Sequence, residues 1–125
     1  DRAFYLDAVY IRIEGFEMYG MREGGIEGWS PHGQAVGNHI HDIGRWCDGR
    51  GTGHSGIGVA NDDWLIEKNI LHDIGRFDST EGGCVPAANT LQLDHGIYVG
   101  AADTVTIKNN IFYNIKRGWP IVFYA

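Results

Sequence analysis

Apolar and polar residues alternate along most of this chain with a period of two. The alternation is visible near the start, at Val9, Ile11 and Ile13, and again near the end, at Ile97 and Val99. A period of two is typical of β-strands with one buried face, whereas an amphipathic helix repeats its apolar positions every three to four residues. The pattern therefore predicts short strands throughout the chain and excludes helical repeats.

Asparagine interrupts the alternation at three similar places. In the segment 96–115 the pattern stops at Asn109-Asn110 and resumes at once, which leaves no room for a hairpin loop. Related sequences start at three of the asparagines: NHIHDIG at Asn38, NILHDIG at Asn69 and NIFYNI at Asn110. A corner that recurs in one sequence setting indicates stacked repeats, whereas the turns of a β-sandwich, the rival fold, would not repeat a sequence.

A second block repeats just upstream of these corners. HSGIGVANDDWLI (54–66) aligns with DHGIYVGAADTVTI (94–107), and a weaker copy, GGIEGWSPHGQAV, covers 24–36. The aligned pairs are Gly56 with Gly96, Ile57 with Ile97, Val59 with Val99 and Asp63 with Asp103. Each unit reads as strand, turn, strand, asparagine corner, strand and variable loop. The loops 45–53 and 76–93 account for the unequal spacing of the corners, because a solenoid repeat tolerates insertions at one point.

Stacking such units places equivalent residues above one another, roughly 4.8 Å apart. An inward asparagine at each corner can then hydrogen-bond to the asparagines of neighbouring coils, as asparagine ladders do in stacked strands. The expected inward columns are Ile57/Ile97, Val59/Val99, Ile66/Ile107, Ile40/Leu71/Phe112 and Ile43/Ile74/Ile115.

Composition narrows the range of partners. The formal net charge is −6 at pH 7, which argues against a nucleic-acid-binding or anionic-membrane-binding surface. No apolar run approaches the roughly 20 residues of a membrane span, and no signal peptide is visible. Both ends lie in strand-like sequence, so we expect a piece of a longer protein. The two cysteines, Cys47 and Cys84, fit no metal-binding spacing and are expected to form either a disulfide or two buried thiols.

The segments DHGIYVGAADTVTIKNNIFYNI and IEKNILHDIG resemble the repeats of right-handed parallel β-helix proteins, the pectate-lyase-like superfamily. The resemblance covers about residues 9–124. It implies an all-β fold, a right-handed single-stranded parallel β-helix of about four coils. Residues 1–125 would form a single domain that is a fragment of a longer solenoid. The resemblance also implies an extracellular or periplasmic location.

This superfamily serves several functions, and fold alone does not choose among them. The resemblance implies a segment of a secreted carbohydrate-active protein that acts on or binds polysaccharide, of the lyase, hydrolase or epimerase type. The alternative is a non-catalytic structural or glycan-binding segment, as in adhesins and tailspikes. A piece excised or engineered as a stability model is a third reading. Whether the chain is an enzyme is therefore left open.

The segment LDHGIY holds the candidate catalytic residues, His95, Asp94 and Tyr98. Asp94 and His95 could form a general acid–base pair where the strand begins. Tyr98 is expected to point outward, and Gly58 stands at the same place one coil earlier, which leaves a space beside the ring that suits a sugar face. The structural alternative is simply the start of a coil, with Gly96 making the corner.

Candidate substrate-binding residues are Lys108, Arg117, His54 and His72. Lys108 is expected to point outward from the second strand of its coil, where substrates commonly lie in the superfamily. The superfamily's lyases often use Arg or Lys as the base on a uronate, with acidic residues that hold calcium. The structural alternative for Lys108 is a solvated strand face.

A histidine–aspartate pair repeats beside the asparagine corner. The pairs, with the third copy, are His41-Asp42, His72-Asp73 and Tyr113-Asn114. They are expected to stack as outward columns, either as a strip that binds metal or sugar or donates protons, or as residues that cap a turn. Repetition favours the structural reading, because an active site needs each group once. A metal clip of His39 with His41 is an alternative, and no metal ligands are assigned.

Three further features leave alternatives open. Asp63, Asp103 and Asp62 are expected at a turn, with Ca²⁺ binding as an alternative cofactor role. A set of aromatic residues is expected to pack, the alternative being sugar stacking: Trp29, Trp46, Trp64, Phe77 and Trp119. Unpaired strand edges at the two ends of the solenoid predict end-to-end self-association.

Overall fold

The computed structural model describes residues 1–47, 52–77 and 93–124, and every regular element in these ranges is a β-strand. The strands form three parallel sheets, named here A, B and C. Sheet A contains β1 (Arg2–Leu6), β4 (Gly24–Gly28), β7 (Ser55–Ala60), β10 (His95–Gly100) and β13 (Ile121–Tyr124). Sheet B contains β2 (Arg12–Glu14), β5 (Gln34–Val36), β8 (Trp64–Glu67) and β11 (Val105–Lys108). Sheet C contains β3 (Glu17–Tyr19), β6 (His39–Ile43), β9 (Ile70–Ile74) and β12 (Ile111–Ile115).

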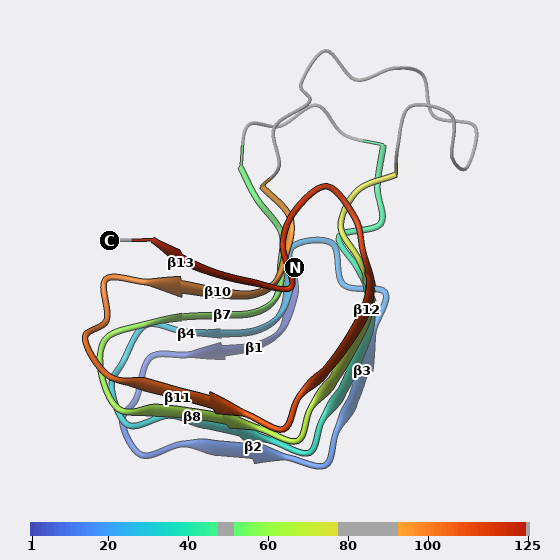
Figure 1. Ribbon diagram of the computed structural model, residues 1–125. Coiled ribbons are helices and arrows are strands. Elements are labelled where there is room, and N and C mark those ends of the chain that lie inside the picture. Colours follow the sequence, from blue (N-terminus) through green and yellow to red (C-terminus); the bar gives the residue numbers. More distant parts are fainter. Residues whose placement is uncertain (48–51, 78–92, 125) are drawn as a thin grey trace.

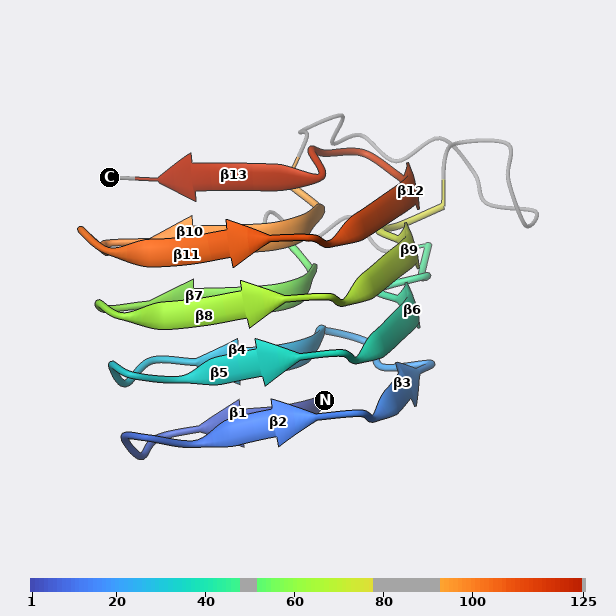
Figure 2. The same cartoon turned by 60° about the horizontal axis from the view of Figure 1, so that its bottom comes forward.

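The chain visits the three sheets in turn, so each circuit forms one coil of a parallel β-solenoid. Figure 1 looks along the stack and shows sheets A, B and C as three sides of the coil. Figure 2 shows the coils lying one above another, from β1–β3 to β10–β12, with β13 beginning a further circuit. The predicted parallel all-β architecture is confirmed at this level.

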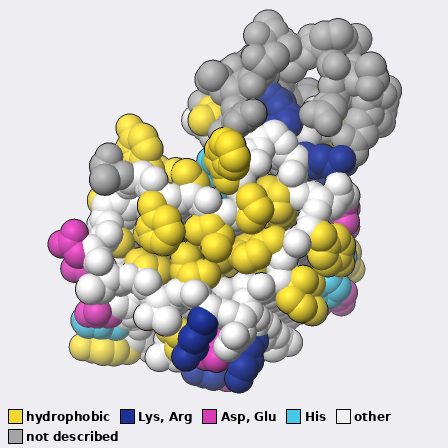
Figure 3. Space-filling view, viewed as in Figure 1, with side chains coloured by type: hydrophobic (Ala, Val, Ile, Leu, Met, Phe, Trp, Pro, Cys, Tyr) yellow, Lys and Arg dark blue, Asp and Glu magenta, His cyan; other side chains and the backbone are white. Residues whose placement is uncertain are grey.

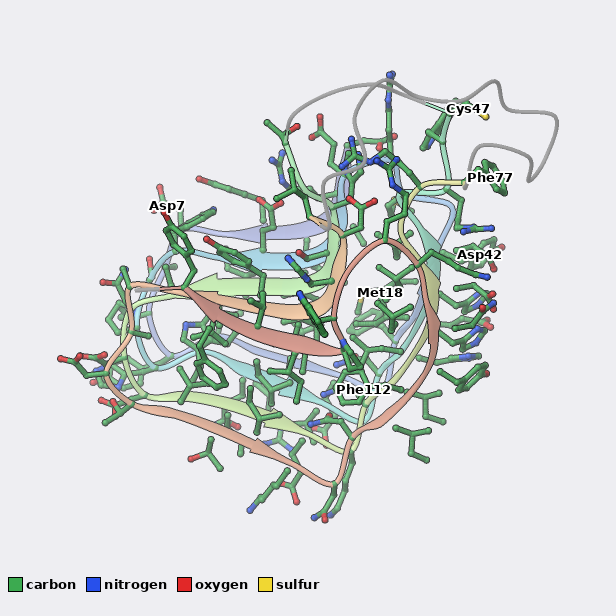
Figure 4. The ribbon with its side chains drawn as sticks, turned by 45° about the horizontal axis from the view of Figure 1, so that its top comes forward. Asp7, Met18, Asp42, Cys47, Phe77 and Phe112 are labelled. Carbon is green, nitrogen blue, oxygen red and sulfur yellow. The ribbon has the colours of Figure 1, made fainter. Side chains whose placement is uncertain are left out.

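Strand register confirms the predicted inward columns. Ile57 pairs with Ile97 in sheet A, and Leu71 lies between Ile40 and Phe112 in sheet C. The fully buried isoleucine, leucine and valine side chains of sheets A, B and C in the two middle coils lie in these columns, because period-two alternation sends one face of every strand inside. Figure 4 shows Met18 and Phe112 directed into the interior and Asp42 directed away from it.

The turn between sheets A and B corrects one alignment. The sequence repeat aligns Asp63 with Asp103. In the structure Trp64 pairs with Val105, so Thr104 stands opposite Asp63. The turn of the fourth coil is one residue longer than that of the third. The Asp103 N–H donates to Asp62 Oδ1 at 2.7 Å, and the Asp63 N–H donates to the Thr104 carbonyl oxygen. The aspartate column therefore runs from Asp62 to Asp103.

The corner between sheets B and C contains the predicted asparagine ladder. Asn38 Nδ2 donates to Asn69 Oδ1 at 3.0 Å, and Asn69 Nδ2 donates to Asn110 Oδ1 at 2.9 Å. The residue before each asparagine has a left-handed backbone, as at Lys68 and Asn109 with φ of 57°. A sharp bend and a buried hydrogen-bonded rung together make the corner.

Among the four tryptophans, only Trp64 packs as predicted. Its ring is 2% exposed, lies over Gly28 and Gly33, and donates its indole N–H to the Ser30 carbonyl oxygen at 2.9 Å. The packing prediction is wrong for Trp29, Trp46 and Trp119, which are 44%, 47% and 53% exposed. They follow strands or lie in connections, where period two no longer decides which face is buried. The half-buried Phe77 ring lies 4.2 Å from the Arg45 guanidinium carbon.

Cys47 is disulfide-bonded, so the free-thiol alternative is wrong for this residue. Cys84, the other cysteine of the sequence, lies outside the described residues, as does most of the loop 76–93. No helix in the described part of the chain is long and apolar enough to cross a membrane.

Candidate functional site

A pocket of about 310 Å³ lies on the outer face of sheet A. β4, β7 and β10 form its floor, and residues next to the two long loops form one wall. The lining residues are Glu27, Trp29, Thr52, Gly53, Ser55, Gly58, Leu93, His95 and Tyr98. Thr52, Gly53 and Leu93 lie at the described ends of the loops 45–53 and 76–93, so these loop ends border the pocket.

A missing side chain opens this pocket. Parallel register places Glu27, Gly58 and Tyr98 in one outward column of three successive strands. A Cβ atom added at Gly58 would contact only Cγ of Glu27, at 3.6 Å. The position is thus open to a side chain, and the predicted space beside the Tyr98 ring is confirmed.

His95 contributes a buried imidazole to the pocket wall. The ring is 5% exposed, and its centroid lies 6.1 Å from that of Tyr98. Its Nδ1 accepts a hydrogen bond from the Trp119 backbone N–H at 3.1 Å, so the neutral ring carries its proton on Nε2. Burial lowers the pKa of His95, against the opposing effect of the Asp94 charge. The neutral form can thus donate one hydrogen bond from Nε2.

Asp94 is fully buried and has other partners than His95. Arg76 donates to its carboxylate from Nη2 at 2.9 Å and from Nε at 3.1 Å. The backbone N–H groups of His54 and Arg76 donate to the same carboxylate at 3.1 and 3.0 Å. The two carboxylate oxygens of Asp94, which precedes β10, therefore hydrogen-bond to the residues just before β7 and just after β9. The acid–base role of Asp94 stays a prediction, and this geometry favours an anchoring role.

Glu27 is the pocket residue that sequence reasoning missed. Its carboxylate forms an ion pair with Arg2 of the first coil, and its side chain is mostly buried. The weak copy GGIEGWS, which begins at Gly24, held the signal: extending the repeat alignment to it places Glu27 beside Gly58. Trp29, two residues later, lines the same pocket, so its alternative role of stacking on a sugar stays a prediction.

The four predicted substrate-binding residues are not brought together. His54 is buried and lines an adjoining pocket of about 350 Å³, which shares Glu27 with the first. Lys108 lies on the outer face of sheet B, with Nζ 3.8 Å from Glu67 Oε1. Arg117 follows β12, where its carbonyl oxygen accepts the Asp94 N–H. His72 lies on sheet C, so only His54 adjoins the pocket.

His72 belongs to the predicted outward column. The stacked rings are Tyr19, His41, His72 and Tyr113, with successive centroids 5.4, 4.9 and 4.4 Å apart. The residue after each later ring has a left-handed backbone, with φ of 51°, 50° and 54° at Asp42, Asp73 and Asn114. Asp and Asn tolerate this conformation better than most residues, which explains why they repeat here.

Local hydrogen bonds shift the pKa of two groups in this column. Burial lowers the pKa of His41, but hydrogen bonds to Asp42 and Glu17 outweigh burial, and the net pKa is raised. Burial raises the pKa of Asp73, but hydrogen bonds from His72 and Asn114 outweigh it, and the net pKa is lowered. Each shift thus favours the charged form.

The turn aspartates use their carboxylates to bind the chain itself. Asp62 Oδ1 accepts the N–H groups of Asp103 and Thr104, at 2.7 and 3.4 Å. Asp63 Oδ1 accepts the Thr104 hydroxyl at 2.9 Å. Ca²⁺ binding at these residues stays a prediction, and the contacts favour turn capping.

Comparisons of the chain with protein-family models, with curated proteins and with solved structures find no match. The structure defines the class of protein as all-β, with coils that stack on one another and form three parallel sheets. The pocket on sheet A brings an aromatic ring, an imidazole and a carboxylate together, at Tyr98, His95 and Glu27.

Proposed function

We propose that the chain is a segment of a secreted right-handed parallel β-helix protein that binds polysaccharide in the pocket on sheet A. The repeats resemble those of the pectate-lyase-like superfamily, and connections between parallel strands of one sheet are right-handed in about 98% of cases. The disulfide at Cys47 supports an oxidising, extracellular or periplasmic compartment.

The open position at Gly58 is the observation that carries this proposal. It leaves a recess between the Tyr98 ring and the Glu27 carboxylate, with the His95 imidazole at its wall. Sugars bind proteins through an apolar ring face and several hydroxyls, so an aromatic surface next to hydrogen-bonding groups suits them. The recess provides both within one pocket.

Charge narrows the class of polysaccharide. Glu27 is the carboxylate among the described lining residues, and the whole chain carries a net charge of −6. The ion pair with Arg2 offsets part of the Glu27 charge, but the net charge of the chain still disfavours an anionic uronate polymer. We therefore favour a neutral, plant-type polysaccharide over an acidic one.

The number of carboxylates in the pocket favours binding over hydrolysis. Glycosidases of the usual kind need two carboxylates flanking the scissile bond, about 5 to 9.5 Å apart. Asp94 is committed to Arg76, so the described residues bring Glu27 alone to the pocket as a carboxylate. A non-catalytic glycan-binding segment is thus the favoured form, and a lyase, hydrolase or epimerase is the second candidate.

Filling the pocket tests the proposal. Tyr5 and Tyr98 already stand in the Gly58 column, so Gly58→Tyr suits the strand and occupies the recess. Calorimetric titration of a panel of neutral and acidic polysaccharides should show binding by the wild type and a loss of at least about tenfold in Gly58→Tyr, or about 1.4 kcal/mol. Thr106→Tyr, on the exposed face of sheet B, is the matched control and should bind normally.

Product assays on the same panel separate the two forms of the proposal. New double bonds or reducing ends that appear with the wild type and disappear in Gly58→Tyr would identify an enzyme. Binding without either product identifies a glycan-binding segment. Equal binding by the wild type and Gly58→Tyr would overturn both.

A further inference from the structure

A second cluster of chemically active side chains lies on the outer face of sheet C. His39 and His41 are two residues apart on β6, so they project from the same face. Glu17 stands opposite His39 on the neighbouring strand β3. One ligand atom from each of the three residues lies within 4.8 Å of the other two. Two adjacent strands thus direct two imidazoles and a carboxylate to one place.

Carboxylate partners fix where the imidazole protons lie. His41 Nδ1 is 2.7 Å from Asp42 Oδ2, and His72 Nδ1 is 2.6 Å from Asp73 Oδ2. Because a carboxylate only accepts, both Nδ1 atoms donate, and the neutral rings carry lone pairs on Nε2. His39 Nε2 lies 2.8 Å from His72 Nε2, so it donates to that lone pair.

Three electron pairs therefore meet when the rings are neutral. His41 Nε2 lies 3.4 Å from Glu17 Oε1, and His39 Nδ1 lies 3.6 Å from the same oxygen. In this neutral form neither nitrogen has a hydrogen to offer to Glu17, whereas a protonated His41 donates to it from Nε2 at 3.4 Å. A metal ion bound here would take the place of that proton. Two imidazole lone pairs and a carboxylate oxygen that face one another form a ligand set for a cation.

We propose that Glu17, His39 and His41 bind a divalent transition metal of the zinc type. Imidazole nitrogens with one carboxylate suit Zn²⁺ and its first-row neighbours, whereas Ca²⁺ takes oxygen ligands. Asp42 orients His41 through Nδ1, as carboxylates orient the histidine ligands of metal sites. Three protein ligands leave a position for water or for His72, the next ring of the column.

The fold does not itself require histidine at these positions. The His41 column contains Tyr19, His72 and Tyr113 in other coils, and the His39 column contains Ile70 and Ile111. Stacking and strand formation are therefore served equally well by Tyr and Ile. His39 and His41 are the histidines that stand beside a carboxylate, Glu17, on the adjacent strand. The cluster lies on sheet C, away from the pocket on sheet A, so this inference is independent of the proposed function.

Metal titration of the intact chain with Zn²⁺ and with Co²⁺ tests the proposal. We expect one Zn²⁺ per chain by calorimetry and a visible Co²⁺ absorption band. His39→Ile and His41→Tyr place in each column a residue that it already holds elsewhere, so the fold should survive, as circular dichroism will show. Each should weaken binding at least tenfold. His32→Gln, at the turn before β5, is the control and should leave the affinity unchanged.

Two further variants keep the test decisive. Glu17 is exposed, so Glu17→Gln leaves the fold intact and should also weaken Zn²⁺ binding at least tenfold. Asp42→Gly restores the residue that the first coil has at the equivalent place, Gly20, and should weaken binding roughly 10-fold through loss of the orienting carboxylate. The proposal is overturned if Zn²⁺ does not bind saturably, or if folded His39→Ile, His41→Tyr and Glu17→Gln bind it as the wild type does.

Discussion

Asn109 and Asn110 are adjacent and identical, yet the fold uses them differently. Asn109 is exposed and has a left-handed backbone with φ of 57°, so it makes the bend. Asn110 accepts the N–H and one Nδ2 hydrogen of Asn69 and donates to the Ile66 carbonyl oxygen at 2.9 Å. The repeat alignment identified the ladder residues of the second, third and fourth coils because only that asparagine recurs.

Removing one rung should destabilise the protein strongly. Asn69 is fully buried and bonds to both neighbouring asparagines and to the Ala35 carbonyl oxygen. Asn69→Ala leaves several buried groups without partners, so we expect a loss of about 3 kcal/mol in the free energy of unfolding. Urea unfolding measures it. The control, Asn109→Gly, copies Gly37 of the second coil and should stay within about 0.5 kcal/mol. Equal losses in the two variants would refute the ladder.

The buried imidazole of His95 predicts a pH dependence. Burial lowers the pKa of His95, which Asp94, Tyr98 and Glu27 face. The unfolded chain takes up the His95 proton near pH 6.5, about the ordinary histidine value, while the folded chain does not. The contribution of His95 to stability should therefore fall as the pH drops below about 6.5, and level off below the folded-state pKa.

Unfolding measurements at several pH values check this sign. The difference in free energy of unfolding between the wild type and His95→Gln should shrink as the pH falls from 8 to 5, a range of about three units that spans the histidine pKa. A proton NMR titration of the imidazole gives the folded-state pKa directly. A midpoint at or above the ordinary histidine value would contradict the predicted direction.

Among the elements, sheet A contains two glycines with different roles: Gly28 makes room for a packed ring, and Gly58 leaves the pocket open. Gly28 and Gly58 lie on neighbouring strands, and a Cβ atom at Gly28 would run into the Trp64 ring. Gly28→Ala should therefore destabilise the protein by about 1 to 3 kcal/mol. Gly58→Ala makes one ordinary contact, with Cγ of Glu27 at 3.6 Å, and should be neutral or stabilising by about 0.5 to 1 kcal/mol. Thermal unfolding compares them, and similar melting temperatures would contradict the assignment.

Asp94 holds three elements together in the same region. Replacing one partner of a buried ion pair leaves the other charge uncompensated, so Asp94→Ala should cost about 3 to 5 kcal/mol. Urea unfolding of this variant measures the cost. A fully stable Asp94→Ala protein would remove the anchoring role and return Asp94 to the acid–base pair.

Sequence predicted the strands well and the connections poorly, for a physical reason. Within strands, period two and repeat alignment fix which side of the sheet a residue takes, which explains the success with the Ile57/Ile97 column and the space at Gly58. Turns follow no such period, so the longer turn at Thr104 and the exposure of Trp119 were missed. The pairing of Arg76 with Asp94 depends on how the loop folds in three dimensions, so the sequence pattern does not reveal it.

For the whole molecule, a stack of coils has two ends and three outer faces. Figure 3 looks onto one end, where hydrophobic side chains gather in the middle of the coil. Ile107, Phe112 and Ile115 of the fourth coil are only partly buried against the core. End-to-end self-association stays a prediction of this exposed interior. The outer faces carry separate features, with the pocket on sheet A and the histidine cluster on sheet C. A ligand of one face should leave the other unchanged.

The central claim is that sugar binds on sheet A beside Tyr98, and chemical-shift mapping tests it most directly. A two-dimensional NMR titration of the labelled chain with a neutral plant-type oligosaccharide reports every amide at once. We predict saturable shifts at Gly58, His95 and Tyr98, and unshifted signals along sheet C. Absence of shifts at the highest oligosaccharide concentration, or shifts confined to sheets B and C, would contradict the account.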